Sequence, residues 1–359
     1  MKIINTSYVK TPEYHDPHKW LKRISFYTGM LEALAKKHEV VSIQRISYEG
    51  RVEQNGVDYH FIYLKNKTAL FPFRLHSIIK KYRPDIVLVN GFVFPLQIIQ
   101  LRLTVGRKVK IIVQNHAEKP STGIKKIFQK LADHVIQRYL FTSHEMGMEW
   151  VKKGIIADEK KLVEVMEASS SFHVKDKEAA IAKTKVNGNP VFLWVGRLND
   201  NKDPLTVLRA FLNFSRHTPN AKLYMIYHTS ELLPDIKAFL GAGENAIQLI
   251  GELPHNDLED WYNASDFIVS GSHYEGSGVA VCEAMSCGCI PIVTDIASFR
   301  KMTGGCGILY PAGDDEALLN ALMSTKQLNV DKLRAKVLEQ FKQELSFEAI
   351  AEKINRVIS

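Results

Sequence analysis

Short apolar runs separated by longer, helically patterned segments dominate the first half of the chain. The runs lie at residues 2–7, 38–43, 85–91 and 109–115. Between some of them, segments such as 21–37 and 74–82 repeat their apolar residues at helical spacing. Strands of a parallel sheet are covered on both faces and therefore read as continuous apolar stretches. The pattern predicts a doubly wound α/β domain over residues 1–168.

The alternation weakens over residues 169–189, which are rich in Ser, Lys and small polar residues and are interpreted as a linker. A second series of strands is then predicted at 191–197, 222–228, 266–271, 290–295 and 307–311. Asp203 followed by Pro204 predicts a helix start, because Asp caps helices and Pro suits the first helical position. A second Rossmann-like domain is therefore expected over residues 190–345.

Residues 346–359 repeat apolar side chains at helical spacing and predict an amphipathic carboxyl-terminal helix with a face to bury. The amino-terminal domain is one surface on which this helix can pack back. Two tandem doubly wound domains are expected to face a central cleft. Ligands of such sheets bind at the carboxyl ends of the strands, so functional residues are sought in the strand-to-helix loops.

Two carboxylates in the stretch 270–295, Glu275 and Glu283, are candidate ligand contacts. On one continuous helix, eight residues would separate them by about 12 Å. That exceeds the roughly 5–5.5 Å between the carboxyl groups of a retaining hydrolase. A better interpretation places Glu275 in a loop and Glu283 inside the following helix, contacting different parts of one elongated ligand. A carboxylate also suits the paired hydroxyls of a ribose.

The residues between these carboxylates are small. Gly276, Ser277 and Gly278 would present backbone N–H groups at a helix start, which is a natural seat for a diphosphate. Upstream, Arg197 and Lys202 follow a predicted strand in the segment 194–204. Two cations there can neutralise a diphosphate and the charge that grows on it as a glycosidic bond breaks. Taken alone, this segment is better interpreted as a solvated loop with ordinary charges.

Together these residues resemble the retaining, nucleotide-sugar-dependent glycosyltransferases of the family-4 type, which have two Rossmann-like domains in the GT-B arrangement. The resemblance rests on the Glu-x7-Glu motif of Glu275 and Glu283, the sequence AMSCGCIPIVTD after it, VGRL with Lys202, LIGELP at 249–254 and GILYPAGD at 307–314. It covers residues 191–325 well and the first half loosely. The first strand is followed by SYVKTPEYHDPHKW, without the glycine-rich loop that many members carry, which makes the acceptor side unusual.

The resemblance implies roles for individual residues. Arg197 and Lys202 would grip the donor diphosphate, and Glu283 would hold the ribose. Glu275 and the backbone from Gly276 to Val279 would contact the transferred sugar and phosphate, while Leu253 would lie near the base. His116, directly after the run 109–115, resembles a histidine that the family places near the reacting sugar. A structural histidine bonded to a neighbouring loop is the alternative.

The implied reaction transfers a hexose-type sugar from a nucleotide diphosphate sugar to a glycan or lipid-linked acceptor with retention and without a metal. The leaving phosphate would itself take the acceptor proton. No cofactor is implied beyond the UDP- or GDP-linked donor, and the residues do not choose between these nucleotides. Alternatives are a sugar-nucleotide epimerase or phosphorylase, or a non-catalytic protein that binds a sugar nucleotide or glycan.

Charge is distributed unevenly along the chain. Residues 1–165 hold 28 Lys and Arg against 15 Asp and Glu, whereas the whole chain has a net charge of +8. The basic half favours an anionic partner, which is a phospholipid surface, a lipid-linked phosphate or an acidic glycan, although ordinary solvated lysines would give the same count. Nucleic acid is not expected, because no binding motif accompanies the charge. The basic segment 119–130 carries Ile124, Ile127 and Phe128, with Leu131 just beyond, on one helical side. This side could lie on a membrane or pack on its own domain.

Four cysteines do not make a disulfide framework, and their spacing is not that of a structural zinc site. We interpret them as core thiols in a reduced, cytoplasmic protein. No apolar run approaches the roughly 20 residues of a membrane-spanning helix. Peripheral attachment to the inner face of the membrane remains the alternative to a freely diffusing protein.

Overall fold

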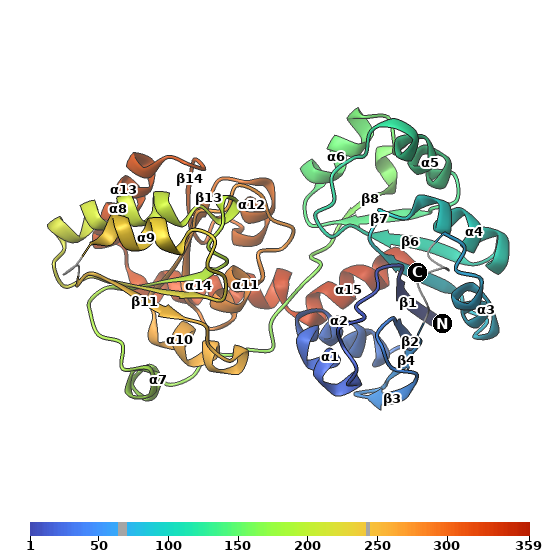
Figure 1. Cartoon of the computed structure of the whole chain (residues 1–359), viewed down its shortest axis with the longest axis horizontal. Coiled ribbons are helices and arrows are strands. Elements are labelled where there is room, and N and C mark those ends of the chain that lie inside the picture. The colour runs from blue at the N-terminus through green and yellow to red at the C-terminus, as the bar shows by residue number, and fades with distance from the viewer. Residues whose placement is uncertain (64–69, 242–244) are drawn as a thin grey trace. The chain divides into compact units, whose positions relative to one another are not determined.

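The structure is a computed structural model that describes residues 1–63, 70–241 and 245–359. The chain forms two compact units (Figure 1). Unit 1 comprises residues 1–169 together with 347–359, and unit 2 comprises residues 170–346.

Unit 1 is built on an eight-stranded sheet with the order β3-β4-β2-β1-β5-β6-β7-β8. Its strands are β1 (Lys2–Ser7), β2 (Glu39–Gln44), β3 (Gly50–Gln54), β4 (Val57–Phe61), β5 (Ile86–Asn90), β6 (Lys110–Gln114), β7 (Arg138–Phe141) and β8 (Leu162–Glu164). All neighbours pair in parallel except β3 and β4. The four apolar runs at the start of the chain are β1, β2, β5 and β6, as predicted, and the strand order reverses between β1 and β5.

Helices surround this sheet. They are α1 (Pro17–Arg23), α2 (Ser25–Ala35), α3 (Phe73–Lys81), α4 (Pro95–Val105), α5 (Gly123–Asp133) and α6 (His144–Lys152). The helical pattern over 21–37 forms two helices rather than one. Asp16 caps α1 by accepting hydrogen bonds from the backbone of His18 and Lys19, and Ile24 separates α1 from α2.

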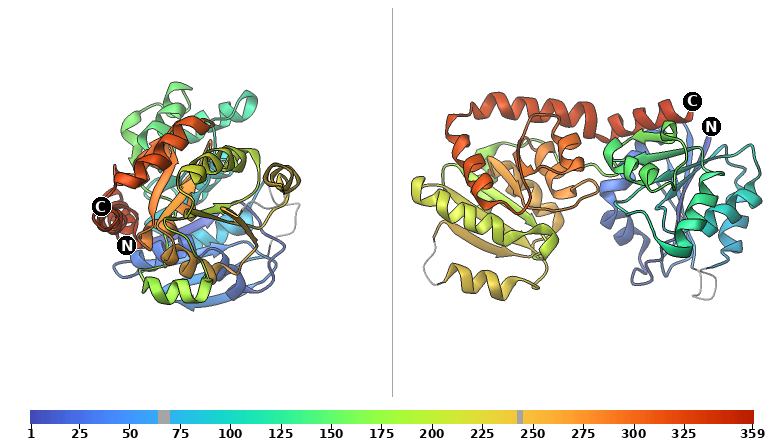
Figure 2. Two further views of the ribbon diagram at one scale, coloured as in Figure 1. Left: turned by 90° about the vertical axis from the view of Figure 1, so that its left-hand side faces the viewer. Right: turned by 90° about the horizontal axis from the view of Figure 1, so that it is seen from above.

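The carboxyl-terminal helix α15 (Phe347–Ile358) belongs to unit 1 and packs on α2. Ile350, Ala351 and Ile354 are buried. A Cβ atom on Gly29 would lie 2.4 Å from the Phe347 ring, so only glycine permits this close approach. Both chain termini consequently lie in unit 1 (Figure 2).

Unit 2 is built on a six-stranded parallel sheet with the order β11-β10-β9-β12-β13-β14. Its strands are β9 (Val191–Gly196), β10 (Lys222–Tyr227), β11 (Ile247–Gly251), β12 (Phe267–Ser270), β13 (Ile290–Thr294) and β14 (Ile308–Tyr310). Numbered within the unit, this is the Rossmann order 3-2-1-4-5-6, with its switch point between β9 and β12. All five strands predicted for this half are present, which confirms two Rossmann-like domains.

The helices of unit 2 are α7 (Lys177–Thr184), α8 (Pro204–His217), α9 (Leu233–Leu240), α10 (Leu258–Ala264), α11 (Val279–Ser286), α12 (Ala297–Thr303), α13 (Asp315–Ser324) and α14 (Val330–Gln340). Asp203 caps α8 and Pro204 opens it, as predicted. The segment expected as a linker holds α7, which packs on α10. The backbone N–H of Lys175 donates to Asn263 Oδ1 at 2.7 Å, so this segment is fastened to unit 2.

The four cysteines are free thiols buried in unit 2, as predicted. Burial is the main cause that raises the pKa of each thiol, to about 11 at Cys306. They are therefore neutral core side chains rather than nucleophiles.

Candidate functional site

Two loops meet at the switch point of unit 2, one after β9 and one after β12. The backbone N–H of His273 donates to the carbonyl of Asn201 at 2.8 Å, and the Asn201 amide donates to the carbonyl of Tyr274 at 3.0 Å. A Cβ atom on Gly271 would lie 2.8 Å from the carbonyl oxygen of Asp203. Glycine at this position therefore allows the two backbones to approach each other.

Lys202 and Glu275 form an ion pair where these loops meet. Their side chains are mostly buried, at 19% and 13% exposure. Both line a pocket with about 230 Å³ of empty volume, which Gly278 and Phe299 also line. The structure thus brings together a cation and a carboxylate that are far apart in the sequence, at the carboxyl ends of β9 and β12.

Helix α11 begins beside this pocket. Its N-cap is Gly278, at φ 55° and ψ 62°, and no side chain caps it. A Cβ atom on Gly278 would lie 2.5 Å from Phe299 Cε1, so left-handed backbone and close packing both require glycine here. Gly276 and Ser277 are buried, and Val279 is half-buried. The uncapped first turn leaves a partial positive charge suited to an anion.

Glu283 lies inside α11, as expected, and is almost fully buried. Its carboxylate faces His255 Nε2 at 2.6 Å and accepts a hydrogen bond from the Tyr262 hydroxyl at 3.0 Å. Burial and then the charge of Glu283 raise the pKa of Tyr262 well above its ordinary value, so the phenol remains a donor. The carboxylate is therefore held in one orientation.

Arg197 and Leu253 are placed apart from the Lys202–Glu275 pocket. Arg197 is exposed in the loop after β9, and no other described residue forms an ion pair with its guanidinium. Leu253 is half-buried in the segment after β11. Neither residue lines the pocket, and neither does Glu283. Lys202, Glu275 and Gly278 therefore form the compact part of the predicted donor site.

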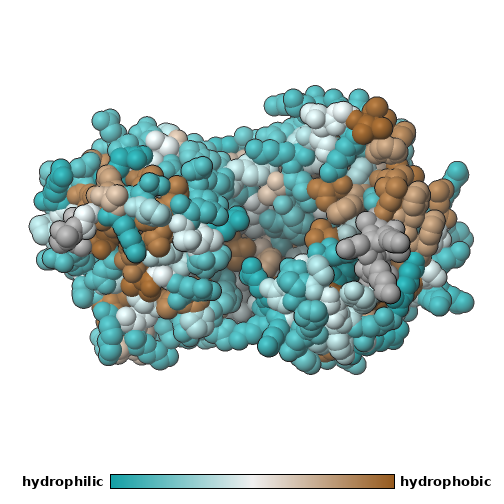
Figure 3. Space-filling view, viewed as in Figure 1, coloured by the Kyte–Doolittle hydropathy of each residue, from teal (hydrophilic) through white to brown (hydrophobic). Residues whose placement is uncertain are grey.

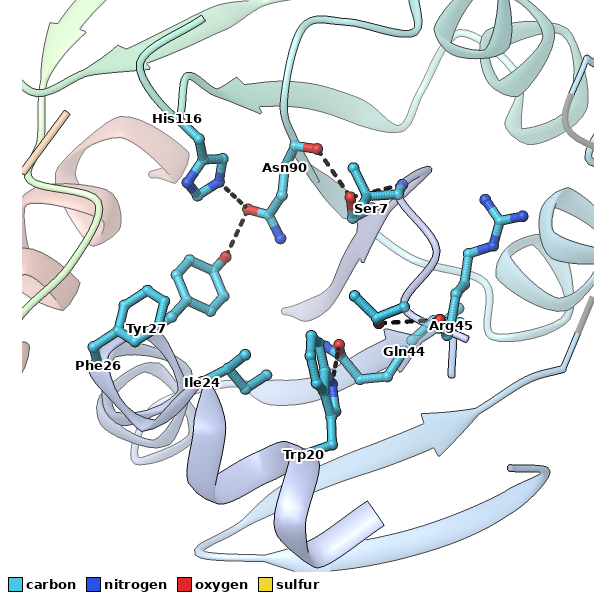
Figure 4. A pocket seen from close by; sticks show the side chains of 12 residues that line it. Ser7, Trp20, Ile24, Phe26, Tyr27, Gln44, Arg45, Asn90 and His116 are labelled. Atoms are coloured by element: carbon cyan, nitrogen blue, oxygen red, sulfur yellow. Dashed lines mark hydrogen bonds between the residues drawn. The ribbon is translucent and has the colours of Figure 1, made fainter. Parts of the chain in front are cut away.

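Unit 1 has its own pocket, with about 700 Å³ of empty volume, at the carboxyl ends of its strands (Figure 4). Ser7, Asn90 and His116 line it at the ends of β1, β5 and β6. Trp20 and Ile24 line its helical side. Apolar walls with polar groups at the strand ends are typical of small-molecule sites.

His116 is held in this pocket by a polar network. Its Nδ1 lies 2.7 Å from Glu167 Oε2 and its Nε2 lies 3.3 Å from Asn90 Oδ1. Tyr27 donates to the same Asn90 oxygen at 2.8 Å, and the Asn90 amide donates to Asn5 Oδ1 at 2.9 Å. Both ring nitrogens thus face oxygen atoms, which the doubly protonated imidazolium satisfies.

The charge balance around His116 agrees with that geometry. Burial alone lowers the pKa of His116, but the hydrogen bond to Glu167 and the charges of Glu167 and Glu118 outweigh it. The pKa of His116 therefore lies above its ordinary value of 6.5. His116 is half-buried, and its surroundings favour the charged, hydrogen-bond-donating form of the imidazole.

Several residues near the two sites were not predicted. Glu167, Asn90, Tyr27 and Trp20 in unit 1 stand in no motif, and neither do His255 and Tyr262 in unit 2. Asn90 lies near the end of the predicted run 85–91, and its position at a strand end was the one available signal. The described residues contain no group of three His, Cys, Asp or Glu side chains placed to hold a metal ion.

Comparisons with known proteins agree with this architecture. The profile of the family described as "Glycosyl transferases group 1" matches residues 176–344. The chain is 31% identical over 87 residues to O-antigen chain mannosyltransferase B of Escherichia coli, covering 24% of this chain and 23% of that protein. It is 26% identical over 139 residues to D-inositol 3-phosphate glycosyltransferase of Streptosporangium roseum, covering 35% and 32%. The chain thus matches less than a third of the length of either relative.

The fold extends over the whole chain. The structure of Alr3699/HepE of Anabaena, solved in complex with UDP, superposes with a TM-score of 0.75 at 13% identity, covering 100% of this chain and 99% of that one. Two tandem Rossmann-like units define the GT-B class, which confirms the predicted fold. The sequence match to the glycosyl transferases group 1 family lies within the carboxyl-terminal unit and covers a little under half of the chain.

Proposed function

We propose that this protein is a retaining glycosyltransferase that moves a hexose-type sugar from a UDP- or GDP-linked donor to a glycan or lipid-linked acceptor without a metal ion. The observation that carries the proposal is the Lys202–Glu275 pair beside the uncapped start of α11 at the switch point of unit 2. Nucleotide ligands of Rossmann-like sheets bind at this place.

The donor site supplies positive charge where the reaction needs it. Lys202 and the first turn of α11 offer a cation and backbone donors to the diphosphate, and Arg197 adds a second cation from the same loop. Negative charge grows on the diphosphate as the bond to the sugar breaks, so these groups stabilise the transition state more than the ground state. Glu275 would turn to the sugar hydroxyls once Lys202 engages phosphate.

Retention is proposed from the resemblance and from the chemistry of the pocket. Once Lys202 engages the phosphate, Glu275 is assigned to the sugar hydroxyls, as the resemblance implies, rather than to attack on the anomeric carbon. A front-face transfer in which the leaving phosphate accepts the proton of the acceptor hydroxyl needs no side-chain nucleophile. Identifying the product anomer by NMR tests this: an inverted product would contradict retention.

A panel of UDP-, GDP- and ADP-sugars in the presence of EDTA tests the function itself. Selective binding and slow hydrolysis of one donor is the expected result, and it names the donor. Product formed without any acceptor, with a changed sugar configuration and intact nucleotide linkage, would instead indicate an epimerase. Transfer of the sugar to inorganic phosphate would indicate a phosphorylase. Binding without turnover for any acceptor would favour a non-catalytic role, and no binding would reject the proposal.

The surface of unit 1 supports a peripheral membrane location. Ile124, Ile127 and Leu131 on α5 are exposed, the first at 73%. Leu103 on the adjacent helix α4 is 80% exposed, and Figure 3 shows apolar surface over this region. Helix α5 also packs on its own domain, but through a different face that carries Gln129, Ala132 and Asp133.

We define Leu103, Ile124, Ile127 and Leu131 as the α4–α5 apolar patch. Lys125 and Lys130 on α5 are exposed, and Lys126 is half-buried. Apolar side chains flanked by lysines on an amphipathic helix suit the interface of an anionic bilayer. No helix among the described residues is long and apolar enough to cross a membrane. We propose an anionic phospholipid surface as the partner of this patch, which brings the protein to lipid-linked acceptors.

A further inference from the structure

The pocket of unit 1 has a polar side and an apolar side. Figure 4 shows Ser7, Asn90 and His116 across the pocket from the residues of its helical side. That helical side, the segment after β1 and strand β2 supply the apolar lining residues Val9, Trp20, Ile24, Phe26 and Ile43. No Asp, Glu or Lys is among the described residues that line the pocket. The pocket therefore offers a ligand extended apolar surface and little charge.

Much of this apolar lining is not covered by the protein itself. Trp20, Ile24 and Phe26 are half-buried, and Val9 is 51% exposed. Water in contact with aromatic and aliphatic side chains is released when an apolar group takes its place, and this release favours binding. A concave site lined in this way selects ligands that can bury apolar surface.

The polar groups beside this apolar lining already have protein partners or are covered. Trp20 Nε1 donates to Gln44 Oε1 at 3.0 Å, and Gln44 Nε2 donates to Ser42 Oγ at 2.8 Å. Arg45 Nη1 donates to the backbone carbonyl of Tyr8 at 2.7 Å, and the remaining guanidinium nitrogens are buried. The pocket therefore presents mainly carbon atoms to a ligand on this side.

Trp20 is held in position before any ligand binds. Besides its hydrogen bond to Gln44, its ring packs on the Tyr14 ring with centroids 4.9 Å apart and a tilt of 59°. A side chain that is already ordered loses little conformational freedom on binding, so more of the gain from apolar contact appears as affinity.

The polar side of the pocket can accept a hydroxyl group. His116 Nε2 lies 3.3 Å from Asn90 Oδ1, and Ser7 Oγ donates to the backbone carbonyl of Asn90 at 3.3 Å. Both distances exceed the usual range for hydrogen bonds, so these weak contacts can be exchanged for bonds to a ligand at small cost. Hydroxyl groups at the strand ends and an apolar group on the helical side would match both sides of the pocket.

We propose that the pocket of unit 1 binds an amphiphilic acceptor, in which the sugar is joined directly to an apolar aglycone. The sugar hydroxyls lie at the strand ends, and the aglycone lies against Trp20, Ile24 and Phe26. A purely hydrophilic oligosaccharide would leave the apolar lining in contact with water. A phosphate or carboxylate would find the guanidinium of Arg45 covered. This inference rests on the proposed transferase function, because only a transferase has an acceptor.

Methyl and butyl β-glycosides of glucose, galactose and mannose test the proposal on the full chain without any donor. The two members of a pair share the sugar and differ only in the length of the apolar group. Each added methylene group improves affinity by up to about fourfold when it is buried. In at least one pair, the butyl glycoside should therefore bind about ten- to fiftyfold more tightly. Equal affinities within every pair, or no binding of any butyl glycoside, would overturn the proposal in the wild-type protein.

Acrylamide quenching of tryptophan fluorescence shows whether the butyl glycoside occupies this pocket. Trp20 is half-buried, whereas Trp150, Trp194 and Trp261 are buried, so Trp20 contributes most of the accessible fluorescence. The butyl glycoside should reduce quenching, and Trp20→Phe should abolish this protection. Binding without protection, or protection that persists in Trp20→Phe, would place the ligand elsewhere and reject the proposal.

Variants of Ile24 locate the apolar contact, and an exposed isoleucine of the same unit gives the matched control. Ile24→Thr should reduce the preference for the butyl glycoside about three- to tenfold, whereas Ile24→Met should largely retain it because its side chain stays apolar. Ile127→Thr on α5, where the isoleucine is 57% exposed, should leave the preference unchanged. A purely structural role of Ile24 would lower the melting temperature of Ile24→Thr but keep the affinity ratio of the two glycosides. That result, or a preference lost in Ile127→Thr instead, would contradict the proposal.

Donor binding separates this inference from the proposed function. Ile24 lies in unit 1, so its variants should bind the nucleotide sugar as the wild type does. If no sugar nucleotide binds while the preference for butyl glycosides persists, the transferase function fails and the amphiphile site stands. If donor binding and hydrolysis are intact but methyl and butyl glycosides bind equally, the transferase function stands and the amphiphile site fails.

Discussion

His116 Nδ1 and Glu167 Oε2 lie 2.7 Å apart at the edge of the unit 1 pocket. The Glu167 side chain is 13% exposed, so this carboxylate acts on the imidazole in a partly desolvated setting. It holds the Nδ1–H and leaves Nε2 directed to Asn90 at the end of β5. Both ring nitrogens of His116 thus face protein oxygens, which disfavours a role as a general base.

We expect Glu167→Gln to lower the pKa of His116, because it removes both the charged hydrogen-bond acceptor and its field, while burial continues to disfavour the cation. An NMR titration of the imidazole signals measures this shift, with the exposed His134 as an internal control. An unchanged titration of His116 in Glu167→Gln would show that the pair does not govern its protonation.

The same pair predicts how stability depends on pH. The folded-state pKa of His116 lies above its unfolded value near 6.5, so the charged histidine stabilises the folded state. This contribution is complete below the unfolded pKa and is lost as the pH rises through the folded pKa. The free energy of unfolding of wild type relative to Glu167→Gln should therefore fall as the pH increases above about 6.5. Urea unfolding at several pH values measures this, and a difference that grows with pH would contradict it.

Lys202 should matter for donor binding and for turnover together. We expect Lys202→Ala to lower kcat/KM by about a hundredfold, because its charge serves the diphosphate in the ground state and more strongly in the transition state. Calorimetry with the preferred donor and initial rates measure the two effects. Lys237→Ala, an exposed lysine on α9, is the matched control. Kinetics of Lys202→Ala equal to those of the control would show that the donor diphosphate binds elsewhere.

The pocket of unit 2 could be anticipated because the candidate donor residues that line it lie in two short, continuous segments. Arg197 and Lys202 stand in the loop after β9, and Glu275 to Glu283 follow β12, which pairs with β9. Rossmann topology brings the two loops together at the switch point, so adjacency in space follows from the strand order. What the pattern did not reveal was the direct Lys202–Glu275 ion pair, which depends on side-chain geometry within the loops.

The pocket of unit 1 could not be predicted in the same way. Its lining comes from the ends of four strands and from α1 and α2, with one to three residues from each, and no motif links them. Glu167 lies at the edge of the predicted first domain, far in sequence from His116. The orientation of α5 was equally hidden: apolar spacing indicates that a helix has an apolar side, but not whether the sheet or the solvent meets it.

A substitution of Gly278 tests whether the backbone at the start of α11 requires glycine. We expect Gly278→Ala to lower the free energy of unfolding of unit 2 by about 2–4 kcal/mol, because left-handed backbone disfavours a side chain and the new methyl group would overlap Phe299. Gly123→Ala is the control: its φ is +59°, but nothing lies within 4 Å of the added atom. It should cost only the backbone strain, about 1 kcal/mol. If urea unfolding showed the same loss of unfolding free energy in both variants, the Phe299 ring would have to move aside at no cost in free energy.

The α4–α5 apolar patch and the lysines beside it should together bind anionic bilayers. Vesicles of phosphatidylglycerol should retain the protein at low salt. The double variant Ile124→Glu with Ile127→Glu should bind at least about tenfold more weakly. Each change removes apolar area that the bilayer would bury and adds a negative charge that the anionic surface repels. Val174→Glu, an exposed apolar position of unit 2, is the control and should leave binding unchanged.

Raising the salt concentration should weaken binding only in part, because screening removes attraction between charges but leaves apolar burial intact. Cosedimentation measures all three comparisons. Binding that is complete in the double variant, or absent in the wild type, would show that these side chains are not directed at a membrane.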